Sequence, residues 1–194
     1  MTAGLFAGMM MLTKAVKKPY FPCFFQPVSM TFEREPLVDV RHAAFLQGGV
    51  SICIGACDRD LVPTLVRATG CRVAPDRCKV TVFLSATQGA LVLRAIRDNC
   101  MVTVVFSEPS THKTVQLKGR DAEIGGLQAG DIHIVERYRG AFSRELEPLG
   151  FEEILVRTLL TCPPADLVSL SFTPCEAYSQ TPGPKAGEPL QATA

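Results

Sequence analysis

The sequence has almost no excess of charge of either sign. Its 194 residues contain 20 Lys and Arg against 19 Asp and Glu, which gives a formal net charge of +1 at pH 7. Proteins that bind nucleic acids use an excess of positive charge to displace counterions from phosphates. We therefore expect this protein to bind neither DNA nor RNA.

Long apolar runs are also missing. No stretch reaches the length that spans a membrane, and the short apolar stretch Leu5–Leu12 precedes the first cations, Lys14, Lys17 and Lys18. A secretory signal has the opposite order, with its cations first. The pattern predicts a cytoplasmic protein that does not associate with membranes.

The sequence lacks the motifs of several common sites. It contains no G-x-G-x-x-G, P-loop or G-x-S-x-G, which argues against a Rossmann fold, a nucleotide hydrolase and an esterase. Its eight cysteines are scattered without a C-x-x-C or a Cys/His cluster, so we predict no metal site. Cys53 and Cys57 are expected on one strand with Cα atoms roughly 13 Å apart, too far for a disulfide. We interpret the cysteines as reduced, apolar-like thiols, with a reactive thiol as the alternative.

What is present suits one compact domain, because 47% of the residues are hydrophobic. Residues 1–29 show no steady period, and we expect a flexible extension or an upstream start there, with an amphipathic docking segment as the alternative. Ordinary patterning begins at Met30. The domain is therefore expected over residues 30–178, followed by a Pro/Gly-rich tail at 179–194.

Hydrophobic periodicity predicts short strands separated by a few helices. Strands are expected at Val50–Cys57, Leu61–Val73, Lys79–Leu84, Met101–Phe106, Thr114–Ile124 and Leu167–Phe172. Helices are expected at Val38–Gln47, from a capping box at Ser85–Gln88 to Asn99, at Asp131–Leu149 and at Phe151–Leu160. The early connections are too short for parallel crossovers, so an α+β barrel of antiparallel strands is favoured over a βαβ sheet.

This order of elements resembles the FMN-binding split barrel of the pyridoxamine-phosphate-oxidase-like superfamily. Residues 95–99 followed by 102–106 are similar to the family's interstrand helix end and fourth strand, and residues 114–119 to its fifth strand. Residues 180–187 resemble the end of an uncharacterised branch of small split-barrel proteins. The resemblance implies a six-stranded antiparallel split β-barrel with flanking helices, an FMN cofactor, and a homodimer that holds the cofactor between its subunits.

In flavin-binding members, an Arg on the second strand and a Lys five residues later hold the FMN phosphate. Arg67 and Arg72 have this spacing, so the resemblance assigns both to the phosphate. Residues five apart on a regular strand lie on opposite faces, so a shared phosphate needs a bulge, which Gly70 can supply. The alternative is that both are solvated strand residues.

The family's second phosphate contact, a Ser-Arg-Lys at the start of the interstrand helix, is replaced here by Ala-Leu-Val at positions 90–92. The helix start at Ser85–Gln88 still offers backbone amides to an anion, with Thr87 or Gln88 adding a side-chain contact. A plain capping box is the alternative.

The family also places a Gln on the fifth strand, where it hydrogen-bonds the flavin ring. Counted from Gly119, Thr114 occupies that place and Gln116 is its neighbour. His112 and Lys113 in the preceding loop are further candidates, since an imidazole can transfer protons near neutral pH. The alternative for all four is an ordinary solvated polar residue.

The resemblance implies an FMN-dependent oxidoreductase that acts on a small organic molecule, with no catalytic residue assigned. True pyridoxamine-phosphate oxidases end in an Arg-x-His element, whereas this tail has only Lys185 as a cation, so vitamin B6 synthesis is not expected. The alternative is a split barrel that serves as a binding module without FMN, or one that binds haem or a deazaflavin. Haem would need an axial ligand from His42, His112, His133 or a Cys thiolate.

Overall fold

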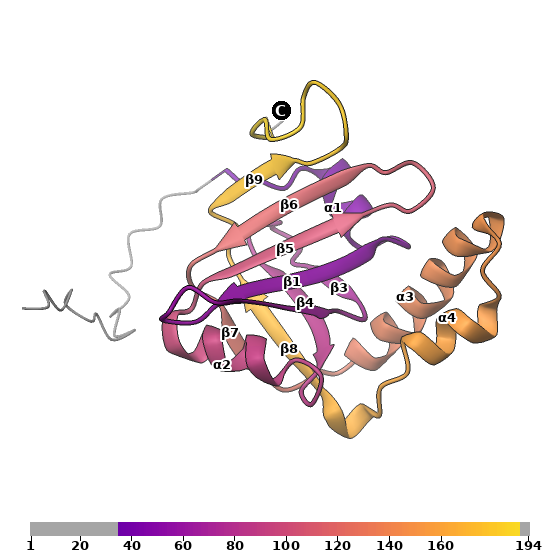
Figure 1. Cartoon of the computed structure of the whole chain (residues 1–194), viewed down its shortest axis with the longest axis horizontal. Helices are drawn as coiled ribbons and strands as arrows, with labels where there is room; N and C mark the ends of the chain where they lie inside the picture. The colour runs from indigo at the N-terminus through magenta and orange to yellow at the C-terminus, as the bar shows by residue number, and fades with distance from the viewer. Residues whose placement is uncertain (1–34, 191–194) are drawn as a thin grey trace, which may run out of the picture.

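The computed structural model describes residues 35–190, in which nine strands form two antiparallel sheets (Figure 1). The five-stranded sheet has the order β2-β1-β5-β6-β9, with bounds β2 Pro63–Arg67, β1 Ser51–Cys57, β5 Val102–Ser107, β6 Thr114–Gly119 and β9 Glu176–Ser179. The four-stranded sheet has the order β3-β4-β8-β7, with bounds β3 Cys71–Val73, β4 Val80–Ser85, β8 Leu167–Phe172 and β7 Glu123–Gly125. The prediction of an α+β fold with antiparallel strands is confirmed.

Four α-helices accompany these sheets in the described part of the chain. They are α1 Val40–Leu46, α2 Ala90–Asn99, α3 Asp131–Leu146 and α4 Glu153–Leu159, and each lies within a predicted helix. A short 3-10 turn, Glu147–Leu149, continues α3, and another, Pro164–Asp166, precedes β8. Among residues 35–190, no helix is both long and apolar enough to cross a membrane.

The predicted helix start at Ser85–Gln88 is a separate turn in the structure. The Ser85 hydroxyl does accept a hydrogen bond from the Gln88 amide, at 3.0 Å, as a capping box requires. The helix itself begins only at Ala90, with Gly89 as its N-cap and no side-chain capping bond. The turn therefore belongs to the end of β4, not to the first turn of α2.

The predicted single strand Leu61–Val73 is wrong, because its residues divide between β2 and β3 in different sheets. The Ala68 amide donates to Ile52 O of β1 at 2.9 Å, and the next amide, that of Thr69, donates to Phe83 O of β4 at 2.7 Å. Gly70 permits this change of sheet, since its φ of 148° is a conformation that side chains disfavour.

The predicted strand Thr114–Ile124 divides in the same way, into β6 and β7. Between them the Ala122 amide leaves both ladders and donates to Cys100 O at 3.0 Å. Because two predicted strands each divide into two, and β9 was not predicted, the six predicted strands become nine. The predicted six-stranded barrel is therefore corrected to two sheets that do not close into a barrel.

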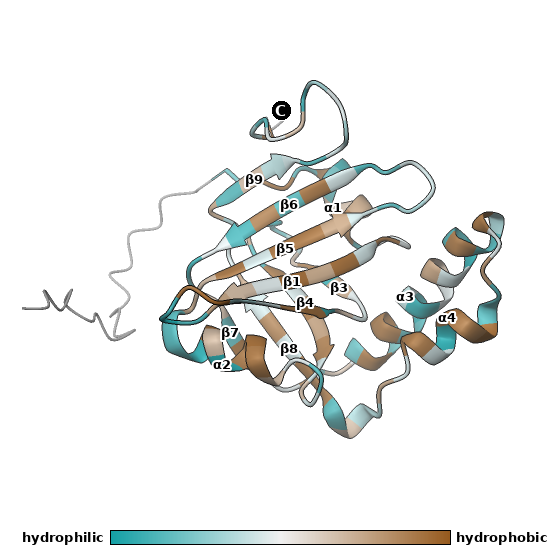
Figure 2. Ribbon diagram, viewed as in Figure 1, coloured by the Kyte–Doolittle hydropathy of each residue, from teal (hydrophilic) through white to brown (hydrophobic). Residues whose placement is uncertain are grey.

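The main core lies between the two sheets. Its buried members include Ile52, Ile54, Val104, Phe106 and Leu117 from the five-stranded sheet, Val82, Leu84, Leu170 and Phe172 from the four-stranded sheet, and Leu93 and Ile96 from α2. Apolar and polar residues alternate along β6 (Figure 2), in step with its alternating burial. The five-stranded sheet therefore has a second face that points away from the core, and no helix crosses this face in Figure 1.

Helix α3 covers part of the outer face of the four-stranded sheet. A small second cluster there consists of Phe83, Val135, Cys162 and Leu167. One turn further along α3, the Tyr138 hydroxyl donates to Val50 O at 2.9 Å, and its ring stacks on that of Phe142. These contacts anchor α3 at the junction of the two sheets.

The structure describes most of the predicted C-terminal tail but not the predicted N-terminal extension. The predicted extension 1–29 lies outside the described residues. Residues 180–190, placed in the predicted tail, fold back along β9, where the Leu190 amide donates to Ala177 O at 2.8 Å. The boundary at 178–179 thus falls inside β9.

Candidate functional site

The outer face of the five-stranded sheet collects side chains from every strand of that sheet. Directly opposed residues of antiparallel strands project from the same face. One row of opposed residues runs Arg67, Cys53, Val105, Gln116 and Tyr178. The next row runs Leu65, Gly55, Thr103, Lys118 and Glu176. Segments far apart in the sequence therefore contribute to one surface.

A groove of about 380 Å³ lies on this outer face. Its lining includes Leu65, Val105 and Met101, together with Gly55 on β1. A Cβ at Gly55 would lie 3.1 Å from the Leu65 side chain, so the absence of a side chain at Gly55 lets Leu65 pack closely over β1. The groove is mainly apolar, with polar groups gathered on the β6 and β9 side.

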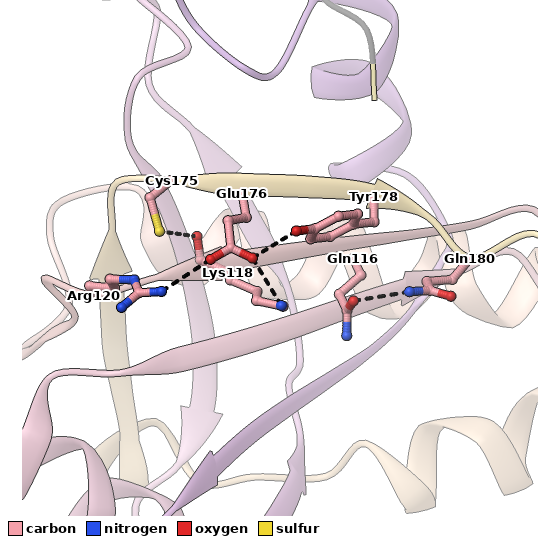
Figure 3. Close-up of polar contacts among 7 residues, drawn as sticks. All are labelled: Gln116, Lys118, Arg120, Cys175, Glu176, Tyr178 and Gln180. Atoms are coloured by element: carbon pink, nitrogen blue, oxygen red, sulfur yellow. Dashed lines mark hydrogen bonds and ion pairs between the residues drawn. The ribbon is translucent and has the colours of Figure 1, made fainter. Parts of the chain in front are cut away.

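The polar side of the groove is organised by Glu176 (Figure 3). Its carboxylate accepts hydrogen bonds from Lys118 Nζ at 2.9 Å, from the Tyr178 hydroxyl at 2.8 Å and from an Arg120 terminal nitrogen at 3.2 Å. The Lys118 bond, followed by those of Tyr178 and Arg120, lowers the pKa of Glu176 to about 2. The same bond raises the pKa of Lys118 above its ordinary value. At neutral pH this rim is a fixed set of charges.

Gln116 lies beside this rim and lines the groove. Its side-chain oxygen accepts a hydrogen bond from Gln180 Nε2 at 3.0 Å (Figure 3). No residue in the range 35–190 hydrogen-bonds its side-chain nitrogen. The Gln180 contact thus fixes the amide while leaving its NH2 group as a donor for a ligand.

The structure does not bring Arg67 and Arg72 together. Arg67 donates to the Ser51 hydroxyl at 3.0 Å and lies over the Phe142 ring of α3, on the five-stranded sheet. Arg72 pairs with Asp131 at the start of α3, on the four-stranded sheet. The two contacts on α3 are separated by roughly 16 Å at 1.5 Å per helical residue. One phosphate therefore cannot join both arginines in this arrangement.

The turn predicted to bind an anion already holds one of the protein's own carboxylates. The Thr87 amide and hydroxyl donate to one oxygen of Asp166, at 3.0 and 2.7 Å, and the Ser85 hydroxyl donates to the other. The Ser85 and Thr87 hydrogen bonds lower the pKa of Asp166. Gln88 is exposed, and its amide is bound by Ser85.

The remaining predicted residues, Thr114, His112 and Lys113, lie at or just before the start of β6 in the five-stranded sheet, outside the groove. Thr114 shares the outer face and hydrogen-bonds the Ser107 hydroxyl at 2.8 Å. His112 is exposed in the β5–β6 loop with φ of 60°, and Lys113 Nζ lies 4.6 Å from the Phe45 ring centre. Of the eight predicted site residues, only Gln116 lines the groove.

Sequence reasoning missed the contribution of β9 to the site. Glu176 and Tyr178 point to the outer face on either side of buried Ala177, an alternation only four residues long that follows Pro174. Cys53 and Cys57 also line the groove. Both are free thiols, in agreement with the interpretation of the cysteines as reduced.

Comparisons with known proteins find structural neighbours at low sequence identity. HupZ of Group A Streptococcus is 13% identical, with a TM-score of 0.47 over 77% of this chain and 99% of that one. An F420 reductase is 14% identical, with a TM-score of 0.47 over 69% and 93% of the two chains. A pyridoxamine 5'-phosphate oxidase-related, FMN-binding protein of Nostoc punctiforme is 11% identical, with a TM-score of 0.40 over 71% and 77%.

No family model and no curated protein matches the chain. Of these three structural neighbours, the Nostoc punctiforme protein is the one whose description mentions pyridoxamine 5'-phosphate oxidase and FMN.

Proposed function

We propose that this protein binds the flat ring of a flavin-type cofactor in the groove of the five-stranded sheet and carries out redox chemistry on a small organic molecule. The observation that carries the proposal is the mainly apolar groove, with a hydrogen-bonded polar rim around Gln116 and Glu176. Its volume of about 380 Å³ falls in the usual range for small-molecule sites, roughly 300–1,000 Å³.

The groove suits the ring part of a flavin. The apolar walls match the ring faces, and the Gln116 NH2 group can donate to a ring carbonyl. Lys118 adds positive charge at the same side. A bound flavin would supply electron and hydride transfer, while these side chains hold and orient its ring.

The residues predicted for the FMN phosphate do not fit it as a set. The Thr87 turn is bound by Asp166, and Arg72 lies on the other sheet. Arg67 shares the outer face with Gln116, but it does not line the groove, and its guanidinium donates to the Ser51 hydroxyl and lies over the Phe142 ring. The proposal is therefore for ring binding, with no phosphate clamp at the start of α2.

A second copy of the chain is the proposed cover for the groove. Leu61 and Leu65 are 78% and 77% exposed, and Met101 and Val62 add further apolar surface along the same edge. A net charge of +1 gives little repulsion between copies, and two-fold dimers are the commonest closed assembly. We expect a homodimer in light scattering, and a folded monomer would remove this part of the proposal.

The decisive experiment compares riboflavin with FMN. The purified protein is first examined for a flavin spectrum and then titrated with each compound while flavin fluorescence is recorded. We expect both to bind with similar affinity, because the phosphate has no dedicated turn. A protein that binds neither compound would overturn the flavin proposal.

The alternative is a split-barrel module without a flavin, and the carboxylate of Asp166 on the Thr87 turn favours it. A haem in the same groove would need an axial ligand, and of the candidate types only the thiols of Cys53 and Cys57 line it. A haem titration with no Soret change and no flavin binding would leave the cofactor-free module. A deazaflavin is tested in the same titrations.

A further inference from the structure

A second cavity, of about 420 Å³, lies on the outer face of the four-stranded sheet. Helix α3 covers the neighbouring part of this face, and the segment with Gly125 and Gly126 forms one wall of the cavity. The cavity shares no lining residue with the groove of the five-stranded sheet. What it binds is therefore independent of the flavin proposal.

The lining is polar and comes from one row of opposed residues. Arg72 on β3 lies opposite Thr81 on β4, and Thr81 lies opposite Ser171 on β8. Neighbouring strands are about 4.8 Å apart, so these side chains can contact one small ligand. The Ala74 amide donates to Lys79 O at 2.9 Å, which continues the pairing and puts Lys79 two residues from Thr81 on the same side.

Arg72 is held in place without using its hydrogen-bonding capacity. Its Nε lies 3.2 Å from an oxygen of Asp131, whose side chain is 2% exposed. The geometry of this ion pair is not that of a hydrogen bond, and Arg72 makes no hydrogen bond to any residue of the described part of the chain. A guanidinium offers five N–H donors in a planar fork that matches a carboxylate or phosphate.

The hydroxyls at the bottom of the cavity add a further donor. Thr81 and Ser169 are each 6% exposed, so ligand contacts there would be shielded from water. The Thr81 and Ser171 hydroxyls are 2.8 Å apart and share one hydrogen bond. Two hydroxyls carry two hydrogens, so one hydrogen remains for a ligand. Ser169 donates to Gly126 O at 2.9 Å and thereby fixes the glycine wall.

We propose that this cavity binds a small molecule through a carboxylate or phosphate group. The anionic group lies between Arg72 and Lys79 and accepts the free hydrogen of the Thr81 and Ser171 pair. Glu123 contacts Lys79 at 3.5 Å, but both side chains are largely exposed, and such pairs contribute little. An incoming oxyanion can therefore replace Glu123 at Lys79.

The test is a titration of the full chain, labelled with ¹⁵N, with inorganic phosphate and separately with acetate. Sodium chloride at matched ionic strength is the reference. We expect saturable shifts at the amides of Gly125 and Gly126, and the anion that saturates at lower concentration identifies the preferred group. Arg72→Lys, which keeps the positive charge beside Asp131, should weaken binding at least about tenfold.

Three further variants make the test decisive. The double variant Thr81→Val/Ser171→Ala removes both hydroxyls and should weaken binding severalfold, because no donor hydrogen is left for the ligand, whereas Glu123→Gln, at an exposed position, should strengthen it. Arg94→Lys on the exposed side of α2 should change nothing and serves as the matched control. Absence of saturable shifts beyond the chloride reference would overturn the proposal. Equal affinities in the wild type, the double variant and Glu123→Gln would do the same, even if Arg72→Lys failed to fold.

Discussion

Asp166 and Thr87 are 79 residues apart in the sequence, and two hydrogen bonds from Thr87 meet at one oxygen of the Asp166 carboxylate. The second oxygen accepts from Ser85, so the turn after β4 is saturated by an internal anion. A flavin phosphate would have to compete with a carboxylate that the fold itself holds in place. The identity of residue 166 therefore controls whether this turn is open to a ligand.

Asp166→Ala should create a preference for FMN over riboflavin. Removal of the carboxylate frees the Thr87 amide and both hydroxyls, which are the donors that a phosphate uses. We expect FMN affinity to rise at least about tenfold in the variant, on the scale of hydrogen bonds to a charged group. Riboflavin affinity should stay the same, and fluorescence titration measures both. Equal gains for the two compounds would contradict this role of Asp166.

Gln116→Leu should weaken flavin binding by about 1–2 kcal/mol, because it removes a hydrogen bond to the ring without changing the volume of the groove much. Gln128→Leu is the matched control, since Gln128 is exposed and does not line the groove. Both variants can be compared by flavin fluorescence. If Gln128→Leu has the larger effect, the ring does not lie against β6.

The carboxylate of Glu176 should remain ionised far into the acid range. Its pKa is about 2 in the folded protein and ordinarily 4.5, so its contribution to stability is fully present above about pH 4.5 and is lost as the pH falls through 2. Carboxyl ¹³C NMR against pH measures this directly. In Glu176→Gln the pKa of Lys118 should fall toward its ordinary value, since the Glu176 bond raises it. A midpoint near 4.5 for Glu176 would show that the rim is not fixed.

Gly70→Ala should lower the free energy of unfolding by about 1–3 kcal/mol, since a side chain would be held in a disfavoured backbone conformation. Its φ is 148°, and the new Cβ would lie 3.3 Å from the Phe83 ring. Gly126→Ala is the control, because nothing lies within 4 Å of a Cβ at that position. Urea denaturation of both variants tests the prediction. Equal stability of the two would mean that the corner between β2 and β3 tolerates side chains.

Much of the fold followed from periodicity, and the errors concern the corners. The alternation along β1 and the continuous apolar run along β5 are local properties of the sequence, so these strands were predicted almost to the residue. Nothing local distinguishes a long strand from two short strands in different sheets. At Ala68 and Thr69 the division is decided by which distant carbonyl accepts each amide, that of Ile52 or that of Phe83.

The candidate site was less accessible to sequence reasoning, for a related reason. Gln116 was found because it lies on a strand with clear apolar and polar alternation, and this strand resembles the fifth strand of the family. Arg67 and Arg72 were paired by their spacing, which holds only while the chain stays in one sheet. The contact between Thr87 and Asp166 joins two unremarkable polar segments, and no pattern in either segment predicts the other.

The fold-back of residues 180–190 has a consequence for how molecules of this protein meet one another. An outermost strand exposes unpaired backbone groups that can template further strands from other chains, which is a common route to aggregation. On β9, the Ser179 amide donates to Glu188 O, the Gly187 amide to Ser179 O and the Leu190 amide to Ala177 O. Pro189, opposite Tyr178, has no amide hydrogen that could pair with a strand of another chain. The segment 187–190 thus covers the β9 edge of the five-stranded sheet. Association of two molecules through the groove face therefore does not compete with strand pairing at that edge.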